Sequence, residues 1–318
     1  MGFLVDGVWH REGSDVKSSD GRFKRADAQF RNWVTADGSP GPSGEGGYKA
    51  EAGRYHLYVG HACPWAHRTV IFRHLKSLEN LISVSVVHWF MGDDGWNFKP
   101  GMGVVGDSVN NARFMHEIYI AADPQFSGRV TIPVLWDRDR RTIVSNESSE
   151  IIRMFNAAFD GIGAAPGDYY PESQRTEIDA INERVYHTVN NGVYRCGFAT
   201  SQEAYDEAVA ALFETLDWLE TRLQSNHFLC GDSITEADWR LFTTLVRFDT
   251  VYHYHFKCNL RRLRDYPKLF AYTKRLYAVR GVSDTVNLEH IKNHYFGSHK
   301  TINPTGIIPA GPRSPLGD

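Results

Sequence analysis

The chain has few cysteines, no long apolar run and almost no net charge. Only four cysteines occur in 318 residues, without paired spacing, which excludes a disulfide scaffold and suits a reducing compartment. No apolar stretch approaches the roughly 20 residues of a membrane span. The net charge of −3 gives no case for nucleic acid or another polyanion as a partner. These absences predict a cytoplasmic protein without membrane or nucleic-acid partners.

A metal centre is not indicated either. The 14 histidines form no cluster of ligand type, and His253 and His255 would point apart on a helix because they are two residues apart. The first residues, Met1–Asp6, lack the basic region of a signal peptide. The 42% hydrophobic and 23% charged residues are typical of an ordinary globular protein, long enough for two domains or one large one.

The most informative segment is His61-Ala62-Cys63-Pro64-Trp65-Ala66-His67-Arg68. It follows an alternating, strand-like run at 54–59 and opens a helix-like apolar pattern. Cys63 is therefore predicted at a helix N-terminus, where unpaired N–H groups and the helix dipole favour a thiolate. Pro64 fits the first helical position, because its missing N–H would have no intrahelical partner there.

A second absence is as informative as the cysteine itself. A dithiol oxidoreductase would carry its resolving cysteine three residues after Cys63, and this chain has Ala66 at that position. The segment therefore predicts a reactive cysteine whose partner thiol comes from outside the chain. Cys196, Cys230 and Cys258 are expected to be small core residues, because free cysteine is among the most buried residue types.

The first half of the chain predicts an α/β domain. Residues 1–47 form a turn-rich arm, and residues 48–160 alternate between strand and helix patterns. The predicted elements are strands at 54–59, 82–87, 130–136 and 142–144, a helix from Cys63, a helix at 147–155 and a Gly- and Asp-rich insertion at 91–111. This βαβ–ββα order fits a thioredoxin-like domain. Because Pro133 has no N–H to donate, residues 130–136 are predicted to form a strand at the sheet edge that runs into a turn. In a thioredoxin-like domain, a cis-proline at this point would let the preceding backbone face a ligand.

The second half predicts an all-helical domain at 168–290. Thr200–Glu203 and Thr235–Asp238 have the spacing of capping boxes. An apolar stripe of about five turns follows the first box, and further helices are expected at 172–191, 235–255 and 266–280. Residues 291–318 are predicted to form an extended, proline-rich tail.

A thioredoxin-like half carrying Cys-Pro, followed by an all-α half, resembles the cytosolic glutathione transferases. Within them, several motifs look like the Xi class, the glutathionyl-hydroquinone reductases: Cys63-Pro64-Trp65-Ala66, Asn146-Glu147-Ser148, Asn190-Asn191-Gly192-Val193-Tyr194 and the tail from Asn293 to Thr305. The resemblance covers nearly the whole chain and shows no departure at a residue that the chemistry needs. It implies a homodimer, glutathione as co-substrate and no tightly bound cofactor.

The resemblance also implies which residues bind glutathione. The backbone of Ile132, supported by Arg129, Val130 and Thr131, would pair with the cysteinyl part of glutathione like an added strand. Glu147 and Ser148 would hold the γ-glutamyl group at a helix start. Trp96 would cover the tripeptide and exclude water.

The catalytic roles follow from the same resemblance. Cys63 would attack the glutathione sulfur of a glutathionyl-hydroquinone, and Tyr194 would protonate the departing ring. Tyr252 and Tyr295 would donate hydrogen bonds to the thiolate and lower the pKa of Cys63. The alternatives are an Omega-like thioltransferase acting on disulfides, a conjugating transferase, and a binding or structural module without activity.

Overall fold

The computed structural model describes residues 2–11 and 20–316, and these form two compact units. The first is built from 2–11 and 26–168, and the second from 20–25 and 169–316. The predicted arm and tail also include positions 1, 12–19 and 317–318, which lie outside the described residues. No helix in the described part of the chain is both long and apolar enough to cross a membrane.

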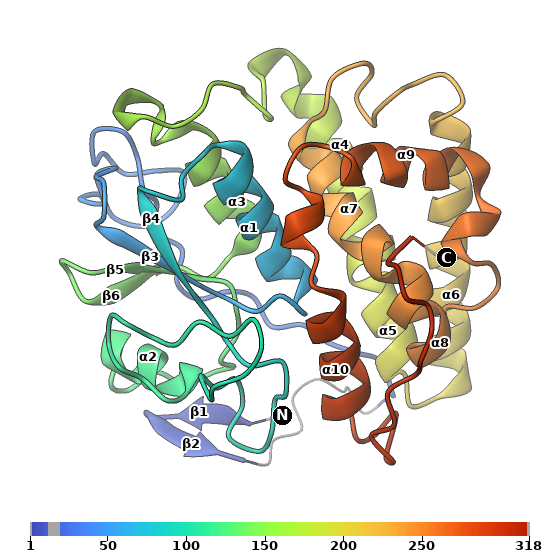
Figure 1. The fold of residues 1–318 in the computed structure, drawn as a ribbon, viewed down its shortest axis with the longest axis horizontal. Coiled ribbons are helices and arrows are strands. Elements are labelled where there is room, and N and C mark those ends of the chain that lie inside the picture. Colours follow the sequence, from blue (N-terminus) through green and yellow to red (C-terminus); the bar gives the residue numbers. More distant parts are fainter. Residues whose placement is uncertain (1, 12–19, 317–318) are drawn as a thin grey trace. The chain divides into compact units, whose positions relative to one another are not determined.

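The first unit holds a mixed four-stranded sheet in the order β4-β3-β5-β6 (Figure 1). Its strands are β3 (Tyr55–Val59), β4 (Ile82–Val86), β5 (Val134–Asp137) and β6 (Thr142–Ser145). β3 pairs with β4 in parallel and with β5 antiparallel, and β5 pairs antiparallel with β6. Every residue of β3 is buried, as expected of a central strand. β1 (Phe3–Val5) and β2 (Val8–His10) form a separate hairpin.

Three helices complete this unit: α1 (Pro64–Leu75), α2 (Met115–Ala122) and α3 (Ser148–Ala157). α1 and α3 lie side by side, and α2 lies apart from them (Figure 1). The β3-α1-β4 and β5-β6-α3 units are the predicted thioredoxin-like order. No helix was predicted at α2, although Met115, Ile118 and Tyr119 form a buried helical stripe there.

The predicted strand at 130–136 needs correction. Pairing begins only at Val134, and the strand is internal, between β3 and β6, rather than at an edge. The reason is that a proline cannot donate a ladder hydrogen bond, so the strand starts after Pro133. The Ile132–Pro133 peptide bond is cis, as the thioredoxin-like interpretation expected.

The second unit is helical, with α4 (Arg175–Val185), α5 (Gly192–Phe198), α6 (Gln202–Arg222), α7 (Glu236–Arg247), α8 (His253–His255), α9 (Pro267–Tyr277) and α10 (Leu288–Ser298). One π-helical turn, Tyr186–Asn190, follows α4, and another, Phe248–Tyr252, joins α7 to α8. Short 3₁₀ turns lie at Asp160–Ile162, Glu172–Gln174, Leu263–Asp265 and Ser283–Thr285.

Two helix boundaries in this unit differ from the prediction, and one capping box is confirmed. Thr235 and Asp238 form the predicted box at the start of α7. At α6 the cap is Ser201, whose hydroxyl accepts from the N–H of Ala204, and not Thr200. Helix also continues to Ser298, beyond the expected limit near 290, because Asn287 caps α10 and Ile291 and Tyr295 share its buried face.

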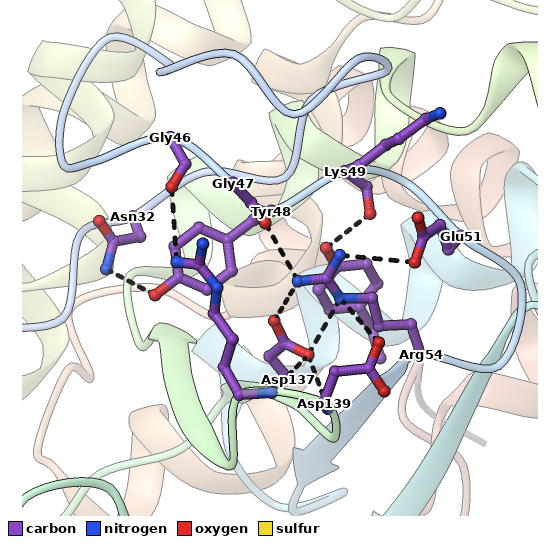
Figure 2. Close-up of polar contacts among 11 residues, drawn as sticks. Asn32, Gly46, Gly47, Tyr48, Lys49, Glu51, Arg54, Asp137 and Asp139 are labelled. Carbon is purple, nitrogen blue, oxygen red and sulfur yellow. Dashed lines mark hydrogen bonds and ion pairs between the residues drawn. The ribbon is translucent and has the colours of Figure 1, made fainter.

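An ion pair ties the residues at 46–49 to the sheet of the first unit. Arg54, just before β3, makes a two-pronged contact with Asp137 at the end of β5, at 2.6 Å and 3.0 Å (Figure 2). Asp137 is fully buried, and Arg54 also donates to the carbonyl of Gly47 at 3.1 Å. Beside this pair, the Arg140 guanidinium lies 4.4 Å from the ring centre of Tyr48.

Replacing Asp137 with alanine should lower the free energy of unfolding by about 3–5 kcal/mol, because it leaves the Arg54 guanidinium without its buried partner. Urea titration followed by tryptophan fluorescence measures this. Asp139→Ala is the matched control. The side chain of Asp139 is 68% exposed and lies 3.7 Å from Arg54, so we expect a loss of only about 0–1 kcal/mol. Equal losses in the two variants would contradict the assigned role of the buried pair.

Candidate active site

Cys63 lies where the sequence predicts it, as the N-cap residue of α1 with Pro64 in the first helical position. Its carbonyl accepts the first helical hydrogen bond, from the N–H of His67 at 3.0 Å. All four cysteines lie in the described residues, and among them only Cys63 is partly exposed. A partly exposed sulfur at a helix start has the access and the favourable dipole that a nucleophilic thiolate needs.

The other three cysteines are buried, as expected. Burial raises the pKa of the Cys230 thiol to about 11, and it raises the pKa of Cys258 well above its ordinary value. These two side chains are therefore held as neutral thiols at physiological pH, which leaves them unsuited to nucleophilic attack.

The loop before the cis-proline faces the Cys63 sulfur. Sγ of Cys63 lies 3.7 Å from the carbonyl oxygen of Ile132. Ile132 belongs to a buried apolar cluster that also contains Trp96, and Cys63 and Val130 pack against the edge of that cluster. Trp96 is only 8% exposed. The structure thus brings Cys63, Ile132 and Trp96, three of the predicted site residues, to one part of the first unit.

Glu147 and Ser148 lie at the start of α3, as predicted. The Glu147 carboxylate caps the helix by accepting from the N–H of Ser149 at 2.8 Å and from its hydroxyl at 2.7 Å. Ser148 is almost fully buried. This capping gives the first turn of α3 a settled geometry, with the positive end of the helix dipole beside it.

Sequence reasoning missed a buried cation at this helix start. Arg68 of α1 is 1% exposed, and its Nη1 lies 3.4 Å from Oγ of Ser148. Its guanidinium stacks on the ring of Trp65, 4.5 Å from the ring centre. A signal was available, because Trp65 and Arg68 are three residues apart in the Cys63 motif and so share a helix face. Arg68 adds positive potential where the γ-glutamyl carboxylate is expected.

Three tyrosine hydroxyls of the second unit form a chain, here called the tyrosine chain. Tyr194 of α5 and Tyr295 of α10 have their hydroxyl oxygens 2.6 Å apart, and those of Tyr295 and Tyr252 are 3.0 Å apart. Tyr252 and Tyr295 are buried, and Tyr194 is half-buried. Burial, reinforced by the neighbouring Tyr194, raises the pKa of both Tyr252 and Tyr295 well above the ordinary value. Both therefore stay protonated and remain hydrogen-bond donors.

The guanidinium of Arg25 lies over the ring of Tyr194, the half-buried member of the tyrosine chain. The Arg25 guanidinium is 5.1 Å from the ring centre of Tyr194, and its Nε donates to Oδ1 of Asn191 at 2.7 Å. The ring of Phe23 stacks on the rings of Tyr194 and Phe198. Residues 20–25 were predicted to belong to a turn-rich arm without a role. Only the fold shows that they contact α5.

Three buried histidines, His255, His294 and His299, have their rings in contact with the ring of Tyr295. Nε2 of His255 and Nδ1 of His299 lie 3.2 Å apart, and His294 packs against both Tyr295 and His299. Burial first, and then the nearby His294 and Lys257, lower the pKa of His255 to about 4. Burial likewise lowers the pKa of His299 well below its ordinary value. Across the described residues, no group of histidine, cysteine and carboxylate side chains is arranged to hold a metal ion.

The lowered pKa of His255 predicts acid destabilisation. Between its ordinary pKa of about 6.5 and the folded value of about 4, the unfolded chain binds the proton and the folded chain does not. The free energy of unfolding is therefore complete above about pH 6.5 and falls as the pH drops towards 4. His255→Gln should reduce this slope by up to about 1.4 kcal/mol per pH unit in urea titrations. His227→Gln, at a side chain that is 76% exposed, is the control and should keep the wild-type slope.

A mixed sheet that carries a cysteine before α1 and a cis-proline before β5, followed by an all-helical unit, is the architecture of a glutathione transferase. Residues 62–158 match the family of the glutathione S-transferase N-terminal domain, and residues 202–275 match that of the C-terminal domain. Both matches fall within the predicted α/β and helical halves.

Two curated relatives indicate which class of glutathione transferase the chain resembles. The chain is 58% identical over 313 residues to glutathionyl-hydroquinone reductase YqjG of Escherichia coli, which covers 98% of this chain and 95% of that one. Glutathionyl-hydroquinone reductase PcpF of Sphingobium chlorophenolicum is 57% identical over 316 residues, or 99% of this chain and 98% of its own.

Solved structures agree with this assignment. The glutathione-bound structure of YqjG has a TM-score of 0.92 at 56% identity and covers 100% of this chain and 97% of its own. A Xi-class glutathione transferase from Natrialba magadii has a TM-score of 0.93 at 45% identity, with 100% and 96% covered. The chain therefore belongs to the glutathione transferase family and, within it, to the Xi class of glutathionyl-hydroquinone reductases.

Proposed function

We propose that the protein is a glutathione-dependent reductase that removes glutathione from glutathionyl-hydroquinones. The observation that carries the proposal is Cys63. It is a partly exposed cysteine at a helix N-terminus, beside the Ile132 carbonyl, and Ala66 stands where a resolving thiol would be. Glutathione then supplies the missing thiol, and the named reductases that are 58% and 57% identical support the aromatic substrate.

The first step transfers the glutathionyl group to the enzyme. The Cys63 thiolate attacks the glutathione sulfur, a Cys63–glutathione disulfide forms, and the bond from that sulfur to the ring carbon breaks. The ring carbon keeps the electron pair of the broken bond and takes up a proton, so that a hydroquinone leaves. An aryl carbanion is a poor leaving group, and a positioned acid is therefore needed. We assign that acid to Tyr194.

The second step regenerates the thiolate. A second glutathione thiolate attacks the mixed disulfide at the glutathione sulfur, which releases oxidised glutathione and frees Cys63. Over both steps the ring carbon gains one hydrogen and is reduced, while the thioether sulfur of the conjugate and the thiol of one added glutathione become the disulfide of oxidised glutathione. Glutathione is thus the reductant as well as the group removed, and the cycle calls for no tightly bound cofactor.

The glutathione subsite is proposed from the residues around the cis-proline and α3. Ile132 would pair its backbone with the cysteinyl part, with Arg129, Val130 and Thr131 supporting the loop. Glu147 and Ser148 would hold the γ-glutamyl group, and Trp96 would cover the tripeptide. The Ile132 carbonyl beside the Cys63 sulfur and the buried cation Arg68 beside Ser148 support this arrangement.

The tyrosine chain is proposed to serve both the acid and the thiolate. When Tyr194 gives its proton to the ring, Tyr295 can donate to the resulting phenolate and can itself accept from Tyr252. In the resting enzyme, before the ring is protonated, Tyr252 and Tyr295 would instead donate to the Cys63 thiolate and lower its pKa, because each hydrogen bond to a charged group contributes about 1.5–3 kcal/mol. The 2.6 Å and 3.0 Å spacings of the three hydroxyls support a linked set of donors. We further propose a cytoplasmic homodimer.

Cys63 can be tested by mass. Incubation with oxidised glutathione should add one glutathione to the wild-type protein and none to Cys63→Ser, because the other three cysteines, Cys196, Cys230 and Cys258, are buried. Intact-protein mass spectrometry, with and without a reductant, measures the adduct. An adduct that survives the Cys63→Ser change would sink the assignment of the nucleophile. No adduct on the wild-type protein would leave a binding or structural module as the better interpretation.

Tyr194 separates the reductase from an Omega-like thioltransferase. Tyr194→Phe should lower the steady-state rate on a glutathionyl-hydroquinone by about 10²–10⁴-fold, the usual contribution of a general acid. Exchange with a small mixed disulfide of glutathione should change by less than about threefold, because a thiolate leaving group needs no such acid.

Tyr254→Phe is the matched control, because it removes a tyrosine hydroxyl from the same unit at a residue that is 71% exposed. It should retain both activities. If Tyr194→Phe loses both activities equally, the residue is not the acid for the ring, and the thioltransferase alternative gains.

A further inference from the structure

A hydroxyl that the mechanism above does not use joins the two proposed glutathione-binding segments. Tyr119 of α2 is fully buried, and its Oη donates to the carbonyl oxygen of Thr131 at 3.0 Å. The same oxygen accepts from the N–H of Thr131 at 3.3 Å and from Nδ2 of Asn146 at 3.0 Å. Thr131 belongs to the cis-proline loop, and Asn146 directly precedes Glu147 and Ser148.

These contacts use the full hydrogen-bonding capacity of the phenol. A tyrosine hydroxyl has one proton to donate and two lone pairs with which to accept. Thr131 and Asn146 account for all three, with Oγ1 of Thr131 also 3.2 Å away. Burial raises the pKa of Tyr119, so the phenol keeps its proton and remains a donor. A saturated and buried hydroxyl has a single orientation and so holds its partners in a defined geometry.

Tyr119 also determines which side of the loop is open to a ligand. Both backbone groups of Thr131 are directed at Tyr119, whereas the carbonyl of the next residue, Ile132, faces the Cys63 sulfur. Successive residues of the loop therefore present their backbone to opposite sides, as in a strand. Thr131 is committed to the protein interior, and Ile132 is left to pair with a peptide that lies beside Cys63.

The second arm of this junction reaches the start of α3. Oδ1 of Asn146 accepts from the N–H of Phe30, and the Asn146 N–H donates to the Phe30 carbonyl, both at 3.2 Å. Asn146 is therefore held from three directions, and Glu147 follows it directly. Oη of Tyr119 therefore joins the loop to the residue before the helix start, next to the β5–β6 pairing that ends with Leu135 opposite Ser145.

We infer that Tyr119 is a positioning residue that holds the cysteinyl and γ-glutamyl subsites of glutathione at their mutual spacing. The inference rests on the proposed function only in that glutathione is the ligand. Two subsites at a fixed spacing bind one tripeptide more tightly than two that move independently, because ordering them adds no cost at binding. Tyr119 itself touches neither the substrate nor the sulfur.

Tyr119→Phe removes only this oxygen and tests the inference. Calorimetric titration with glutathione should show a dissociation constant roughly tenfold higher than that of the wild type. A loss of this size is expected when the hydrogen bonds of the Tyr119 hydroxyl to Thr131 and Asn146 are removed. The rate at which Cys63 reacts with bis(2-hydroxyethyl) disulfide, which has no γ-glutamyl group, should stay within about twofold. Unchanged glutathione affinity, or an equal loss with both reagents, would overturn the inference.

Tyr58→Phe is the matched control. Tyr58 is fully buried in the same apolar cluster, and its hydroxyl donates to Asp107 and accepts from Asn110, both at 2.9 Å. We expect a comparable loss of thermal stability and a normal glutathione affinity, which separates positioning from general stabilisation. A similar affinity loss in Tyr58→Phe would count against a specific role for Tyr119.

A second variant keeps the test independent of any one substitution. Asn146→Ala removes the amide that Tyr119 accepts from and should also weaken glutathione binding. In the double variant the two losses should combine to less than their product, since both break the same junction. Fully multiplicative losses would contradict the inference. Hydroquinone turnover does not enter these readouts, so its absence in the wild type would contradict the proposed function alone.

Discussion

The contact between the Cys63 sulfur and the carbonyl of Ile132 is the constraint on which the active-site half of the protein depends. It requires that the first turn of α1 and the loop before β5 meet, although 69 residues separate them. The parallel pairing of β3 with β4 and the antiparallel pairing of β3 with β5 place the loop beside the helix start. The mixed sheet thus brings the motif cysteine and the backbone of the cis-proline loop together.

Within each unit, several buried polar groups have their charge or their proton fixed by their surroundings. Arg68 is held between Trp65 and Ser148, Tyr119 is saturated by Thr131 and Asn146, and Tyr252 and Tyr295 are kept protonated by burial. Each of these groups would cost free energy if it were buried without partners. Their hydrogen-bond and ring partners offset that cost and hold each donor in a defined orientation.

Several features could be predicted from the sequence because their signals are local. The Cys63 helix start follows from a strand pattern, a proline and an apolar helix pattern within about 25 residues, and the Thr235 capping box follows from four residues. The misses are of another kind. β5 is an internal strand because β3 and β6 flank it, which no local pattern indicates. The helix α2 follows a Gly- and Asp-rich insertion, and its short apolar stripe was overlooked there. Arg25 and Arg68 have charges that read as solvated until the fold buries or stacks them.

By itself, the sequence determined that one cysteine begins a helix, that no resolving thiol follows at Ala66, and that an α/β half precedes a helical half. Spacing along a single segment carries that information, because helix starts and strand alternation depend on neighbouring residues. Only the tertiary structure decided that Tyr119 joins Thr131 to Asn146, and that Tyr194, Tyr295 and Tyr252 share one line of hydroxyls. Those contacts join residues up to 101 positions apart, and a hydrogen bond depends on distances of a few tenths of an ångström that no local pattern encodes.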